Sequence, residues 1–445
     1  MSRLLVAALV VLLSSSAFAA EPPAQPEQRR KIASVVDLEG EIQWLRKQVE
    51  NQNLDGAGCL RLFSETYDRL WNSTPVDYAP DARSREELKK KGPLLIQLLF
   101  ETRLLVRQRI WDLNKKGEAS RECTNSARGI LRASRFVEDT LGQLSLDFPK
   151  NDPKKMPPVL KGETPWLVTN PKFGKLELKT GDVLISRGNA FTSAAIARIA
   201  EADAQFSHAA LIYVDEKTGD VETMEAHIEI GSIVAPLEKY LKDGKTRSVL
   251  FRHRDARLAA KAAKLLRQEI LNYNNAHKDN YPYDFKMDET NAKEIFCSEL
   301  IRRGFELASN GQQILPTITS LVNPRNPKFI QRLGIMPGET MLPGDMELDE
   351  RFDLVAEWRD YTRMNDSHIH DAILMTMYDW MDRHSYQLYD SGWTKIKKHV
   401  VWNLRRWPLF SNLLFDKLPR NMSKSIIATV TTLNRVATVL QEHLI

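Results

Sequence analysis

The sequence lacks the motifs and the charge balance that would place it in several common classes of protein. There is no glycine-rich phosphate loop, no His-Glu-x-x-His and no Gly-x-Ser-x-Gly, so nucleotide-binding, zinc-protease and serine-hydrolase interpretations have no motif behind them. The 63 basic and 58 acidic residues leave a net charge of +5 on 445 residues, which gives little support to nucleic-acid binding. Hydrophobic residues make up 42%, enough for packed cores, and this length predicts two or three domains.

The N-terminus has the pattern of a signal peptide. Arg3 supplies a positive start, residues 4–13 form an apolar run, and an Ala-Phe-Ala triplet ending at Ala19 is a small-x-small cleavage signal. The apolar run is too short to span a bilayer comfortably, although a retained membrane anchor is the alternative. We predict that segment 1–19 is removed, with cleavage near Ala19 or Ala20, and that the mature protein is periplasmic or secreted.

Cysteine is scarce, and its three positions are Cys59, Cys123 and Cys297. In an oxidising compartment an odd number leaves one thiol without a partner in the chain. Cys59 and Cys123 both lie in a region of helical pattern, where a disulfide would link two helices. We therefore predict the Cys59–Cys123 disulfide, which leaves Cys297 as a free thiol that is either buried and inert or chemically employed.

The hydrophobic pattern divides the mature chain into four segments. Residues 20–147 carry apolar positions at spacings of three and four, which predicts a helical N-terminal region. Residues 148–175 are rich in proline and lysine and are interpreted as a linker. Residues 176–335 mix strand-length apolar runs with amphipathic helices and predict an α+β domain, whereas residues 336–445 return to a helical pattern. Basic and aromatic residues mix in 400–420, which suggests either peripheral membrane contact or simple packing.

Cys297 lies near the start of a predicted helix. Suitable capping residues at 288–291 predict a helix that begins at 292–295, which places Cys297 in its first turn or two. The partial positive charge of a helix N-terminus stabilises a thiolate, the reactive form of the side chain. The alternative is a cysteine packed in the core on the inward face of the helix.

His208 and Glu225 are predicted to meet across a hairpin. His208 begins an apolar strand, residues 215–220 form a turn, and the next strand carries Glu225 near the same end as His208. A carboxylate in that place would orient the imidazole and favour its protonated form. A histidine that is merely structural is the alternative.

Other titratable side chains are less informative. His227 and His253 flank core strands and are interpreted as structural. Asp366 and His370 would share one face of a helix, where a metal is conceivable, but no metal or cofactor is assigned.

Together these segments resemble the YiiX/YebB-type proteins, a circularly permuted branch of the NlpC-type, papain-fold cysteine hydrolases. In that branch the histidine strand precedes the cysteine helix, as it does here, and the resemblance covers about residues 175–335. It rests on Gly181-Asp182-Val183-Leu184, Ser207-His208-Ala209-Ala210-Leu211, Glu225-Ala226, Tyr283-Asp284-Phe285 and Phe296-Cys297-Ser298-Glu299-Leu300.

The resemblance implies a permuted papain-like fold with a Cys-His-Glu site. Cys297 would attack a carbonyl, His208 would take and later return the proton, and Glu225 would hold the ring. The backbone N–H of Cys297 would meet the oxyanion, and Tyr283 is a further candidate for this role. The expected reaction is hydrolysis or transfer at an amide or ester bond through an acyl-enzyme, without a cofactor.

Export combined with this chemistry suggests three functions. A cell-wall peptide bond is the first expectation, which would make the protein a peptidoglycan amidase or endopeptidase. An acyl bond in an envelope lipid or lipoprotein is the alternative, because permuted relatives include enzymes that act on acyl chains. An inactive papain-fold protein that binds or scaffolds a partner is the alternative from another class.

Overall fold

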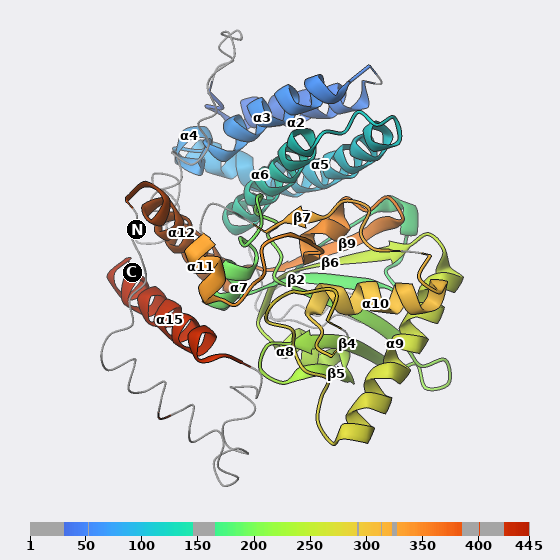
Figure 1. Cartoon of the computed structure of the whole chain (residues 1–445). Coiled ribbons are helices and arrows are strands. Elements are labelled where there is room, and N and C mark those ends of the chain that lie inside the picture. Colours follow the sequence, from blue (N-terminus) through green and yellow to red (C-terminus); the bar gives the residue numbers. More distant parts are fainter. Residues whose placement is uncertain are drawn as a thin grey trace.

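The computed structural model describes residues 31–51, 53–145, 165–291, 293–312, 314–322, 327–384, 400 and 422–444 (Figure 1). The predicted signal peptide 1–19 lies outside these residues, and so does the stretch 400–420 beyond its first residue. Within the described residues, no helix combines the length and the apolar character that crossing a membrane requires.

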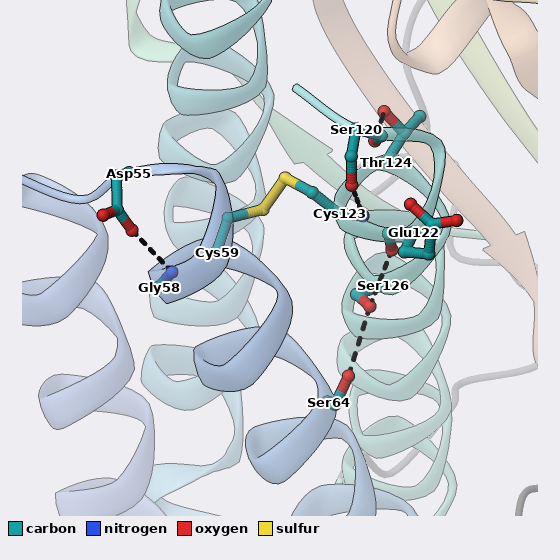
Figure 2. Close-up of a disulfide and its surroundings, with 9 residues drawn as sticks. All are labelled: Asp55, Gly58, Cys59, Ser64, Ser120, Glu122, Cys123, Thr124 and Ser126. Atoms are coloured by element: carbon teal, nitrogen blue, oxygen red, sulfur yellow. Dashed lines mark hydrogen bonds between the residues drawn. A yellow bond between two sulfur atoms is a disulfide. The ribbon is translucent and has the colours of Figure 1, made fainter. Parts of the chain in front are cut away.

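The N-terminal helices pack side by side on the upper side of the view in Figure 1. Asp55 and Asp81 cap two of them, because each side chain accepts a hydrogen bond from a backbone N–H of the first turn. Cys59 and Cys123 form the predicted disulfide and join α3 to α6 (Figure 2). The helices are α2 (Val35–Glu50), α3 (Gly56–Trp71), α4 (Pro75–Tyr78), α5 (Ala82–Lys115) and α6 (Arg121–Ser145).

The centre of the molecule is an antiparallel sheet in the order β1-β9-β6-β2-β3-β4-β5. β3 and β4 form the predicted hairpin, with Ala210 opposite Glu225. A separate pair joins β7 to β8. The strands are β1 (Pro165–Thr169), β2 (Val183–Gly188), β3 (His208–Val214), β4 (Val221–His227), β5 (Gly231–Pro236), β6 (Lys245–His253), β7 (Ser320–Leu321), β8 (Glu339–Thr340) and β9 (Phe352–Asp360).

The remaining helices cover the sheet and its edge. Figure 1 shows α10 in front of the sheet and α11, α12 and α15 grouped beside α7 at one side. They are α7 (Phe191–Ile196), α8 (Leu237–Lys242), α9 (Ala256–His277), α10 (Cys297–Ser309), α11 (Pro327–Arg332), α12 (Tyr361–His384) and α15 (Lys424–Leu444), with 3-10 helices η2 (Pro171–Phe173) and η3 (Pro343–Glu347).

Two segment predictions were wrong. β9 lies between β1 and β6, although residues 336–445 are predicted to be helical, and β1 lies at 165–169, inside the predicted linker 148–175. β9 escapes a hydrophobic-pattern analysis because its buried positions include Glu357 and Arg359, whose partners lie more than 200 residues away in the sequence. The mixed α+β class itself agrees with the structure.

One face of the sheet is apolar over its β3 half. A Cβ on Gly304 of α10 would lie 3.4 Å from Leu211 of β3 and from the α9 backbone, so these elements approach closely. Leu211 pairs with Val183, and Ile185, two residues on, points to the same face. All three side chains are fully buried, so this half is held by hydrophobic packing.

The same face becomes ionic over β6 and β9. Ile185 pairs with Val249, and Val249 pairs with Glu357, so Glu357 points to the same side as the apolar residues. Its carboxylate lies 2.8 Å from Arg103 of α5 and 3.2 Å from Arg135 of α6. Although burial opposes ionisation, these arginines hold the pKa of Glu357 well below its usual range. Ion pairs therefore fix the N-terminal helices to the sheet.

Candidate active site

Cys297 is the first residue of α10, and Phe296 is the residue that precedes the helix. The helix begins later than the predicted 292–295. Ile295 donates its N–H to the Pro282 carbonyl at 2.9 Å and accepts a hydrogen bond from Asp284 at 3.2 Å, so this stretch of backbone is already bonded outside the helix. The result places the Cys297 sulfur at a helix N-terminus, where backbone N–H groups are free to meet an anion.

His208 and Glu225 are brought together by the register of the β3–β4 hairpin. His208 Nε2 lies 2.7 Å from Glu225 Oε2. The hydroxyl of Thr223 donates to the other oxygen, Oε1, at 2.7 Å, and the Glu225 side chain is fully buried. The carboxylate is thus fixed from both sides and holds the imidazole in one orientation.

His227 also lies in this cluster, although its place beside a core strand predicted a structural histidine. Its Nε2 lies 3.3 Å from Glu225 Oε2, and its ring centre lies 5.1 Å from that of His208. The signal in the sequence is the period of two along β4, since Thr223, Glu225 and His227 project to the same side of the strand.

Cys297 lies between two cavities. A polar cleft of about 380 Å³ is lined by Cys297, His208, His227 and Tyr283, together with Lys245. A smaller cavity of about 150 Å³ also reaches Cys297 and Tyr283, but most of its lining is apolar and includes side chains of α7 and α15. The structure therefore brings Tyr283 into the same cleft as the cysteine and the histidine.

The electrostatics of the buried site differ from the expected ion pair. Burial, with a further contribution from the Lys245 charge, lowers the pKa of His208 to about 4, and this outweighs the opposing effect of Glu225. Burial raises the pKa of Cys297 to about 11, against the stabilising backbone N–H groups nearby. Both shifts favour a neutral thiol and a neutral imidazole over the expected ion pair, and a neutral His208 is in the form that can act as a base.

The two other groups of the site also have defined protonation states. Burial opposes ionisation of Glu225, but its contacts with the two histidines hold its pKa well below the usual value. Burial raises the pKa of Tyr283 well above its usual value, so its phenol keeps a proton that it can donate.

The side chains that could bind a metal lie in a different place from the Asp366 and His370 pair considered in the sequence. His370 Nδ1 lies 3.0 Å from the Asn189 carbonyl oxygen, and the neighbouring His368 lies 3.1 Å from Asp139. Among the described residues, the group whose ligand atoms converge is His208, Glu225 and His227.

A cysteine at a helix N-terminus, beside a histidine held by a buried carboxylate, is the arrangement of residue types found in papain-like cysteine hydrolases. Residues 177–354 match the model of a family described as permuted papain-like amidase enzymes, YaeF/YiiX, C92 family. The match supports a YiiX-like permuted papain fold for this segment of the chain. No curated protein and no solved structure matches the chain.

Proposed function

We propose that the protein is a cysteine amidase that works through an acyl-enzyme on Cys297. The sulfur forms a thioester with the substrate carbonyl carbon while the bond to the leaving group breaks. His208 takes the thiol proton and returns it to the leaving group. Water then cleaves the thioester, which releases the acid and restores the thiol. Glu225 stays ionised and holds the ring throughout.

The observation that carries this proposal is the shared cleft. Cys297 and His208 line one cavity of about 380 Å³, and the His208 ring is fixed by a fully buried carboxylate 2.7 Å away. The N–H groups at the start of α10 are suited to stabilising the oxyanion, and Tyr283 is a further candidate donor in the same cleft. The match to an amidase family supports the reaction class.

We place this chemistry in the cell envelope, with a cell-wall peptide as the first substrate. The predicted signal peptide supports export to the periplasm or the exterior. Lys239 and Lys245 line the cleft together with Glu229 and Asp243. Charges of both signs suit a peptidoglycan stem peptide, which carries amino and carboxyl groups.

A second substrate class, an acylated lipid or lipoprotein, is favoured by the smaller cavity. Ile196 of α7, Phe285 and Ile426 of α15 contribute to its mainly apolar lining next to Cys297. Apolar cavities of about 150 Å³ accept a benzene-sized group. An acyl chain that enters this cavity would present its carbonyl to the Cys297 sulfur.

The inactive, partner-binding alternative has less support from the site. Such a protein would be expected to fill the cleft above the histidine with an apolar side chain. Instead, His208 and Cys297 both line an open cavity, and the supporting carboxylate is in place.

Turnover of two probes by the full-length protein tests the proposal: p-nitrophenyl acetate as an activated ester and alanine 4-nitroanilide as an amide. Cys297→Ala should abolish turnover, and His208→Ala should lower kcat/KM by about 10²–10⁴, the usual contribution of a general base. His277→Gln, which changes an exposed histidine of α9, is the control and should match the parent. Turnover that survives Cys297→Ala would sink the proposal.

The substrate class is then decided by comparing a cell-wall peptide fragment with a short N-acyl amide. Preference for the peptide supports the envelope peptidase. Preference for the acyl amide supports an acylated lipid or lipoprotein as substrate, provided that the preference disappears when Ile426→Trp fills the apolar cavity.

A further inference from the structure

Two histidines share one carboxylate oxygen at the site. His208 Nε2 and His227 Nε2 lie 2.7 Å and 3.3 Å from Glu225 Oε2, and each of the three residues offers one ligand atom within 4.8 Å of the other two. The contact to His208 is a hydrogen bond. The contact to His227 does not have that geometry, so within the described residues the His227 Nε2 is buried without a hydrogen-bond partner.

This set of groups matches the ligands of a well-known kind of metal centre. Two imidazoles and one glutamate hold zinc in His₂Glu sites, where the fourth position stays open. The Thr223 hydroxyl donates a hydrogen bond to Oε1 of Glu225, and Oε2 faces both histidines. Carboxylates that bind metals are commonly hydrogen-bonded in this way. Both rings line the polar cleft, which gives an ion a path from solvent.

We propose that His208, Glu225 and His227 form a reversible zinc site, and that the zinc-bound protein cannot carry out the reaction of Cys297. The second half of this proposal rests on the proposed function, whereas the binding site does not.

The conflict between zinc and catalysis lies in the two nitrogens of His208. We assign the proton of the neutral ring to Nε2, because that nitrogen faces the Glu225 carboxylate. Nδ1 then carries the lone pair that accepts the Cys297 proton. Zinc must bind a lone pair on Nε2, so the single ring proton moves to Nδ1 and the base is blocked. The ring gains or loses no proton overall, since only its tautomer changes.

This mechanism differs from the capture of a catalytic thiolate by zinc. Cys297 is not a member of the converging ligand group among the described residues. Zinc should therefore bind whether or not the thiol is present, and binding should depend on His227, which takes no part in the proposed chemistry of Cys297.

Calorimetric titration of the full-length, metal-free protein with Zn²⁺ tests the site directly. One ion should bind per chain, and Cys297→Ala should retain the parent's affinity. His227→Gln should weaken binding by at least about 30-fold, because even outer partners of metal ligands are worth 10–100-fold. His277→Gln, the same substitution at an exposed histidine, is the matched control and should bind as the parent does.

The inhibitory half is tested by acylation of Cys297 with p-nitrophenyl acetate. Zinc should suppress acylation in the parent, EDTA should restore it, and His227→Gln should need correspondingly more zinc. His227→Ala provides a second variant, and its thermal unfolding together with that of His227→Gln checks that both are folded.

Five outcomes would each overturn part of the proposal. No zinc binding, or binding lost in Cys297→Ala and kept in His227→Gln, removes the site. Turnover that requires zinc and is lost in EDTA removes the inhibitory role and makes the cluster a catalytic centre. Zinc that binds without slowing acylation removes the tautomer mechanism. Absence of Cys297 acylation in EDTA removes the proposed function, and the inhibition with it, but leaves the zinc site standing.

Discussion

Over β3 the sheet is covered by α9 and α10 through apolar contacts, whereas over β6 and β9 the helices α5 and α6 meet the same face through charged side chains. The apolar half carries the candidate nucleophile, and its helices lie within about 60 residues of one another in the sequence. The ionic half joins segments that lie more than 200 residues apart. Hydrophobic packing therefore joins site elements that are close in the sequence. Ion pairs join the distant N-terminal helices to the sheet.

We expect the two halves to respond differently to substitution. Hydrophobic packing is non-directional and tolerates changes of shape that conserve volume. Buried charges need each partner in place, because removing one leaves another charge buried and uncompensated. The buried ion pairs of the ionic half include those of Arg103, Arg135, Arg247 and Arg359 with Glu138, Asp139, Glu347 and Glu357.

The largest expected loss in the free energy of unfolding comes from Glu357→Gln. This change leaves Arg103, Arg135 and Arg359 without the carboxylate that they share, and breaking a buried pair costs about 3–5 kcal/mol. Denaturant unfolding of the full-length protein measures the loss. Glu216→Gln, which removes the partner of Lys264 in a solvent-exposed pair, is the control and should leave the unfolding free energy unchanged. Equal effects in the two variants would contradict the ionic account.

A smaller loss is expected when the disulfide of the helical region is removed. Cys59 and Cys123 are 64 residues apart, and replacing both by alanine should cost about 2–4 kcal/mol. Ser64→Ala is the control on the same helix pair, since its hydroxyl lies 3.2 Å from that of Ser126 at an exposed place (Figure 2). Acylation of Cys297 in the folded variant should equal that of the parent. A loss of acylation would show that the helical region acts on the site.

A pair of conservative substitutions separates the two halves most cleanly. Arg103→Lys cannot reproduce the contacts of a guanidinium to both Glu138 and Glu357, and hydrogen bonds to charged groups are worth about 1.5–3 kcal/mol each. We expect a loss of about 2–3 kcal/mol from this change. Leu300→Met in α10 conserves volume and should cost less than about 1.5 kcal/mol. The reverse order of the two losses would show that the ionic half is the more tolerant.

The smallest expected effect is a difference between the parent and Glu357→Gln in how the free energy of unfolding depends on pH. The pKa of Glu357 in the folded protein lies well below its ordinary value of 4.5. Its contribution to stability is therefore fully present above the unfolded pKa and is lost as the pH falls through the folded pKa. Between about pH 5 and pH 3 the unfolding free energy of Glu357→Gln should change less steeply, by up to about 1.4 kcal/mol per pH unit. Identical slopes for parent and variant would contradict the depressed pKa.

The apolar half was predictable from the sequence, and the ionic half was not. Periods of two and of three or four revealed the β3–β4 hairpin and the approximate position of α10, and the hairpin in turn placed Glu225 beside His208. β9 was missed because a buried strand is predicted from its hydrophobic residues, and the buried residues Glu357 and Arg359 of this strand are charged. Their burial depends on α5 and α6, which no local window contains.

The candidate site residues were named before the structure, whereas their electrostatics could not be predicted. The resemblance to the permuted papain-fold family suggested Cys297, His208 and Glu225 as site residues. In the structure Cys297, His208 and Tyr283 line one cleft, and Glu225 contacts His208. Burial and the charge of Lys245 on β6 lower the pKa of His208, and burial raises the pKa of Cys297. The contact of His227 with Glu225 depends on the position of its ring, which the sequence alone does not give.

The most direct test of the central claim is mass spectrometry of the protein quenched during turnover of p-nitrophenyl acetate in EDTA. The account predicts an acetyl group on Cys297 that forms rapidly in the parent, forms far more slowly in His208→Ala, and is absent from Cys297→Ala. Turnover without any adduct on Cys297, or an equal rate of adduct formation in His208→Ala, would contradict the assignment of Cys297 as the nucleophile and His208 as its base.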